Sequence, residues 1–137
     1  MNSTQNWATM AKVVLAAILT FFTDLLGGWG DALEILTFFI VADIVSGWIR
    51  AVIQKELSSN ESFRGACKKL LIYVLVAVAV QVDRLMALDF VGRVVILFYC
   101  AGEGLSILEN SVAAGLPVPE ALVNILKQLR EKKFQED

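Results

Sequence analysis

The sequence predicts an all-α integral membrane protein, and two observations carry that prediction. Of its 137 residues, 57% are hydrophobic and 19% are charged, whereas soluble domains have about 45–50% apolar and about 25% charged residues. The apolar residues gather into runs long enough to cross a bilayer as helices, which satisfy their backbone hydrogen bonds internally. The length suits one membrane domain, residues 1–137, without a second globular domain.

Residues 10–30 form the first apolar segment, which has the weakest apolar pattern of the predicted spans. Its continuous core, Val13–Phe22, is short, and Asp24 follows two residues later. Such a segment fits a membrane span, an interfacial amphipathic helix or a signal peptide. No A-x-A cleavage site follows, and Lys12 is the only basic residue before the core. Both observations argue against cleavage as a signal peptide. We therefore expect three or four spans in all.

The second span is expected at residues 32–53, after a glycine-rich turn at 27–30. Asp43 lies near its middle, where a carboxylate costs about 2.5–3.5 kcal/mol if it faces lipid. Gly47 and Arg50 follow at spacings of four and three residues, so all three share one helix face. This small, polar face predicts a contact with protein or water.

Beyond the second span, residues 54–69 are read as a basic loop, followed by spans at 70–87 and 93–110. The fourth span carries Glu103, Ser106 and Glu109. After a break rich in glycine and proline, residues 119–134 predict an amphipathic helix, with apolar residues at i, i+3, i+4 and i+7. Those apolar residues are Leu122, Ile125, Leu126 and Leu129.

The distribution of lysine and arginine predicts the orientation. Segment 54–69 and the C-terminal tail are both basic, and short basic loops remain in the cytoplasm. Four spans would also place the N-terminus inside. The expected topology is therefore multi-pass, with a cytoplasmic C-terminal helix.

Asp43 and Glu103 fall at similar depths, near the middle of their spans. Arg50 and Glu109 both reach the cytoplasmic boundary, where we expect them to pair. In one interpretation the buried charges only neutralise one another between packed helices. In the other, Asp43 and Glu103 line a hydrated lumen formed by several copies. Small residues beside them, Gly47 and Ser106 among them, permit close helix packing in either case.

Enzymatic function is not expected. The chain has no histidine and two cysteines, which removes the usual zinc ligand sets and His-dependent nucleophiles. Cys67 and Cys100 differ in setting, so a disulfide is not expected. We predict no catalytic residues, cofactor or metal, and the net charge of −2 gives no indication of nucleic-acid binding.

Several motifs resemble those of phage lysis and toxin-secretion holins. The similarity runs through the second span, Lys55–Ser59 and Phe63–Gly65, and covers roughly residues 33–130. Its most specific part is EGLSILEN, Glu103–Asn110, followed by the G-x-P-x-P of Gly115–Pro119.

The resemblance implies a small non-enzymatic protein that oligomerises in the bacterial inner membrane and opens lesions. Its partners would be further copies of itself, the lipid bilayer, an endolysin or large toxin as cargo, and an antiholin. Two alternatives stay open at this point. One is a small ion channel or transporter subunit that uses the buried carboxylates, and the other is a non-conducting antiholin or scaffold.

Overall fold

The computed structural model describes residues 3–131, without the side chains of residues 3–5, 126 and 129–131. In that range the chain is α-helical, and four of its helices are long and apolar enough to cross a membrane. The predicted all-α membrane fold is confirmed. The helices are α1 (Ser3–Leu25), α2 (Asp31–Gln54), α3 (Ser59–Met86), α4 (Val91–Ala113) and α5 (Glu120–Glu131). The predicted C-terminal helix extends to residue 134, and its last three residues lie outside the described range.

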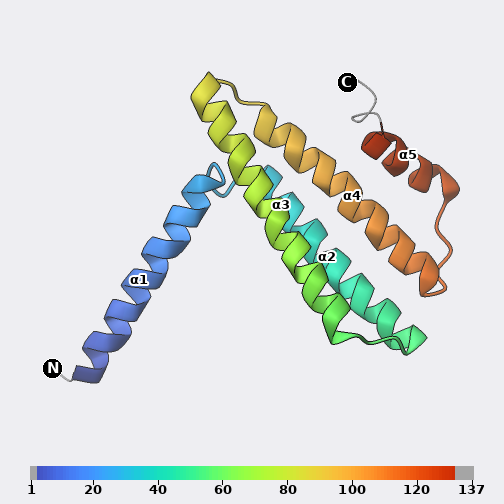
Figure 1. Ribbon diagram of the computed structural model, residues 1–137, viewed down its shortest axis with the longest axis horizontal. Coiled ribbons are helices and arrows are strands. Elements are labelled where there is room, and N and C mark those ends of the chain that lie inside the picture. The colour runs from blue at the N-terminus through green and yellow to red at the C-terminus, as the bar shows by residue number, and fades with distance from the viewer. Residues whose placement is uncertain (1–2, 132–137) are drawn as a thin grey trace.

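Helices α2, α3 and α4 run side by side and form the body of the molecule (Figure 1). Helix α4 packs against α2 and α3, and α5 folds back along α4. Helix α1 diverges from this body, and its C-terminal end contacts the last turns of α3. The functional geometry is therefore set by three helices, α2 to α4.

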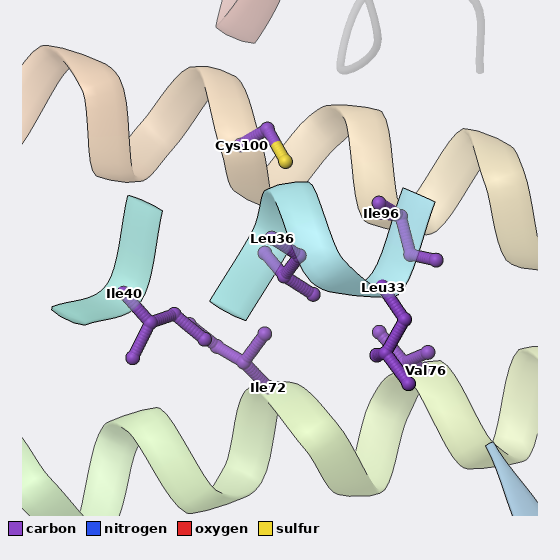
Figure 2. Close-up of a cluster of buried hydrophobic side chains, with 7 residues drawn as sticks. All are labelled: Leu33, Leu36, Ile40, Ile72, Val76, Ile96 and Cys100. Atoms are coloured by element: carbon purple, nitrogen blue, oxygen red, sulfur yellow. The ribbon is translucent and has the colours of Figure 1, made fainter. Parts of the chain in front are cut away.

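The apolar core lies where these three helices meet (Figure 2). Leu36 of α2 and Val76 of α3 are fully buried, and Cys100 of α4 is 9% exposed. Because apolar surface is not driven together in lipid, close van der Waals packing of these side chains holds the helices in register. The cluster consists of Leu33, Leu36, Ile40, Ile72, Val76, Ile96 and Cys100.

The expected turn between the first two helices is present. Gly27 and Gly28 have φ angles of +84° and +89°, a region that L side chains avoid and glycine adopts at no steric cost. No residue in the candidate span Asn6–Leu25 is buried. The turn thus releases α1 from the body instead of folding it back against α2.

The expectation of a loop over all of residues 54–69 is wrong. Helix α3 begins at Ser59, so only the short link after Gln54 is non-helical. Ser58 is the N-cap, and its hydroxyl accepts a hydrogen bond from the backbone N–H of Glu61 at 3.4 Å. Ser58 and Glu61 have the Ser-x-x-Glu spacing of a capping box, which starts helices. The polar composition of this segment had concealed that signal.

Polar residues near the end of α3 form the junction with its neighbours. Arg84 donates to the Asp24 carboxylate at 3.2 Å and to its carbonyl oxygen at 2.7 Å, and Gln81 donates to the carbonyl oxygen of Leu25. Asp83 accepts from the backbone N–H groups of Val91 and Gly92 at the start of α4. The density of charge at this boundary therefore serves helix–helix contacts.

Asp83 caps α4 from the preceding helix. Its Oδ1 accepts from Val91 N at 3.0 Å and its Oδ2 from Gly92 N at 2.7 Å. Phe90, the N-cap residue, offers no side-chain acceptor, so the carboxylate satisfies backbone donors that a helix start otherwise leaves free. A Cβ on Gly92 would lie 3.3 Å from Asp83 Oδ2, which explains why glycine suits this position.

We expect Asp83→Ala to lower the thermal unfolding midpoint of the detergent-solubilised protein, because two backbone donors lose their acceptor. Asp83→Asn, which retains one carbonyl acceptor, should fall between the wild type and alanine. Asp89→Ala is the control, since within residues 3–131 Asp89 makes only an exposed ion pair with Arg93, a type of pair that contributes little. Equal effects of the two alanine variants would contradict the capping role.

Candidate functional site

At mid-length of α2 and α4, Lys69 of α3 places its ammonium group between two carboxylates. The Nζ atom lies 2.7 Å from Oδ2 of Asp43 and pairs with Oε2 of Glu103. The side chains of Lys69, Asp43 and Glu103 are 17%, 11% and 9% exposed. We call these three residues the ion cluster. Because each comes from a different helix, the cluster links α2, α3 and α4.

Asn110 of α4 extends the cluster by hydrogen bonds. Its Nδ2 donates to Asp43 Oδ1 at 3.2 Å and to Ser46 Oγ at 3.0 Å. Ser46 in turn donates to the backbone carbonyl of Asp43 at 3.0 Å. Asp43 is thereby bound through both carboxylate oxygens, which fixes its position between α2 and α4.

The ion cluster lies at the same distance from three helix ends. Asp43 stands 11 residues before Gln54, Lys69 stands 10 after Ser59, and Glu103 stands 10 before Ala113. At 1.5 Å per residue these distances are about 15 Å, half of a hydrocarbon core of about 30 Å. A hydrogen bond of 3.2 Å from Gln54 Nε2 to the Ala113 carbonyl holds two of the ends together. We call this side of the body the 54–59 end.

Two of the other predicted site residues lie near the cluster. Gly47 is half-buried, and a Cβ added there would lie 3.6 Å from Asn110 Nδ2, so its small size suits the approach of α2 to α4. Ser106 is half-buried and lines an open cleft of about 520 Å³ beside Asp43. Four predicted residues, Asp43, Gly47, Glu103 and Ser106, therefore gather in one region.

The expected pair of Arg50 and Glu109 is not formed. Arg50 is half-buried, lines the cleft, and its Nε has no hydrogen-bond partner within the described residues. Glu109 is exposed and lines a hollow between α4 and α5 together with Lys127. The two residues share a depth but point to different sides of the body, and depth was the only quantity that the sequence supplied.

Sequence reasoning missed Lys69 and Asn110. Lys69 was assigned to the loop, whereas the capping box at Ser58 places it in the third turn of a helix, at the depth of the two carboxylates. Asn110 follows Glu103 by seven residues and therefore shares its helix face. Both signals were present in the sequence, but the first depended on recognising where α3 begins.

Comparison with known proteins identifies the family. A family model described as "Bacteriophage holin family" matches residues 20–131. The chain belongs to this family. The probable holin of Bacillus phage phi105 is 32% identical over 109 residues, covering 77% of this chain and 81% of the phage protein.

Relatives also occur in bacterial genomes. An uncharacterized 14.9 kDa protein of Clostridium perfringens is 40% identical over 131 residues, covering 94% of this chain and 99% of that protein. The uncharacterized protein Lin0175 of Listeria innocua is 38% identical over 127 residues, covering 92% of this chain and 91% of its own length. No solved structure matches the chain.

Family membership and the four apolar helices together describe a membrane-integral protein of the holin family. Membership supports a holin role, and holins generally assemble in membranes. The ion cluster shows how this holin-family chain accommodates two carboxylates at mid-depth: Lys69 partly neutralises Asp43 and Glu103 inside one copy.

Proposed function

We propose that this holin-family protein oligomerises in the bacterial cytoplasmic membrane and opens pores that release an endolysin or a large toxin. The observation that carries the proposal is the family match over residues 20–131. The structure supports it with four helices of spanning length around buried charges. Endolysin release leads to lysis, whereas toxin release amounts to secretion.

The proposed orientation places the 54–59 end and the C-terminus in the cytoplasm. Arg64 and Lys68 are exposed near the 54–59 end, and α4 ends at the same level, so α5 follows on that side. Basic residues on short segments favour the cytoplasmic side. Four crossings would place the N-terminus there as well.

Induced expression with and without a cytoplasmic endolysin tests the proposal. We expect culture turbidity to collapse only when both proteins are present, and a large cytoplasmic enzyme to appear in the medium. An empty vector with the endolysin is the control, because the endolysin alone cannot reach the cell wall. Unchanged turbidity with both proteins accumulated would refute the proposed function.

A small ion channel remains the second candidate, and the open cleft that reaches Asp43 favours it. The two functions differ in the size of what passes. A channel would dissipate the membrane potential, as a fluorescent potential dye reports, while the cytoplasmic enzyme stays inside. Release of the enzyme would identify a holin pore. An antiholin or scaffold would neither dissipate the membrane potential nor release the enzyme.

A further inference from the structure

The open cleft leads from the 54–59 end to the ion cluster. It begins at Leu57 and Ser58, in the link between α2 and α3, and reaches Asp43 and Lys69. Its volume is about 520 Å³, room for many water molecules at roughly 30 Å³ each. Since the ion cluster is about 15 Å from the helix ends, the cleft penetrates roughly half of a bilayer.

One wall of the cleft is polar at a depth where neighbouring surfaces are apolar. The first three turns of α3 contribute Glu61 and Lys68 to the cleft. At the same level, the outward face of α2 carries Val45, Ile49 and Val52, which are 50%, 52% and 61% exposed. An apolar outer face suits lipid, whereas charged groups at this depth face protein or water. The two surfaces therefore meet different surroundings.

Charges at the inner end of the cleft also require a polar medium. The ion cluster contains two carboxylates and one ammonium group, so its formal charge is −1 when all three groups are ionised. Arg50 lies on the cleft wall, and its Nε has no hydrogen-bond acceptor among the described residues. A buried charge without full compensation is costly unless water or dipoles solvate it.

We propose that the cleft between α2 and α3 is a water-filled entrance that carries the aqueous phase from the 54–59 end to the ion cluster at mid-membrane. This inference rests on the proposed function in one respect only, namely that the helices stand across a membrane. In this proposal the aqueous path runs along a cleft within a single copy and does not require several copies to form. Asp43 and Lys69 then form the inner end of that path, and Glu103 lies behind Lys69 as its second carboxylate partner.

Single cysteines at matched neighbouring positions test the entrance. In a chain carrying Cys67→Ser and Cys100→Ala, the pairs are Ala51→Cys with Val52→Cys near the end, and Ile44→Cys with Val45→Cys at the depth of the ion cluster. Ala51 and Ile44 line the cleft, whereas Val52 and Val45 are exposed on the lipid side. A charged, membrane-impermeant thiosulfonate reagent is added to right-side-out and to inverted membrane vesicles, and the reaction rates are compared.

We expect the cleft cysteines to react faster than their neighbours by on the order of tenfold or more, because the reactive thiolate forms in water and not in lipid. The reaction should occur from one side only, and that side reports the orientation. Gly65→Cys provides a second variant on the opposite wall, since no atom lies within 4 Å of a Cβ placed there. If a substitution beside Asp43 prevents the protein from accumulating, Gly65→Cys still reports whether water reaches the cleft.

Equal rates for both members of each pair, fast or slow, would overturn the entrance. Fast reaction at all positions would mean that this half of the body stands outside the membrane. No reaction at any position would mean that the cleft is closed to water. Lysis is measured separately with the endolysin. A variant that lyses cells while its cleft cysteine is shielded refutes the entrance alone, and fast, selective labelling without lysis refutes the proposed function alone.

Discussion

Lys69→Met is expected to lower the free energy of unfolding by about 3–5 kcal/mol, the cost of removing one partner from a buried ion pair. The substitution preserves much of the side-chain volume but leaves Asp43 and Glu103 side by side without a cation. Both are largely buried, so water relieves their repulsion only in part. Unfolding of the purified protein in mixed detergent micelles measures the loss.

Lys68→Met is the matched control, because Lys68 is the adjacent lysine, is exposed and makes no ion pair within the described residues. It should change stability by no more than about 0.5 kcal/mol. Adding Glu103→Gln to Lys69→Met should restore part of the loss, because one of the two unpaired charges disappears. Indistinguishable effects of the two lysine variants would show that the ion cluster does not stabilise the fold.

Asp43→Asn and Glu103→Gln are expected to delay lysis strongly or to prevent it while leaving insertion and oligomerisation intact. Each change keeps the shape of the side chain but balances the formal charge of the ion cluster, since one carboxylate then faces Lys69. A neutral ion pair requires less solvation by water than a cluster with a net charge. It therefore favours the closed packing of α2, α3 and α4. Lysis onset after induction with endolysin measures the delay, and cross-linking measures oligomers.

Glu34→Gln supplies the control for the loss of one negative charge, since Glu34 is exposed near the start of α2. Its lysis onset should match that of the wild type. If Asp43→Asn and Glu103→Gln both lyse on the wild-type schedule, the carboxylates only hold helices together. Their role in opening would then be excluded.

Hydropathy and spacing were sufficient to predict the membrane fold, because span length follows from bilayer thickness. They also placed Asp43 and Glu103 at a common depth, and the structure joins both to Lys69. What they could not supply was the direction in which a residue faces around the body. Arg50 and Glu109 share a depth yet face different neighbours, because helix order around an axis depends on packing between residues far apart in the sequence.

The start of α3 was predictable but was overlooked for a physical reason. Charged and small polar residues usually indicate solvent, and the segment after Ser58 is rich in them. A capping box, however, depends on two residues three positions apart and not on average polarity. The capping box at Ser58 predicts a helix that begins at Ser59, and such a helix places Lys69 at the depth of the two carboxylates.

Because α1 diverges from the body, packing within one copy places few constraints on its amino-acid sequence. A side chain that fits between neighbours is specified by shape, whereas one that meets only fluid hydrocarbon is specified by little more than its apolarity. No residue of Asn6–Leu25 is buried, and the family model begins at residue 20, after most of this helix. Within one copy, leucine, valine and phenylalanine should therefore replace one another along α1 with little effect on packing, whereas the same replacements at Leu36 or Val76 would disturb the core.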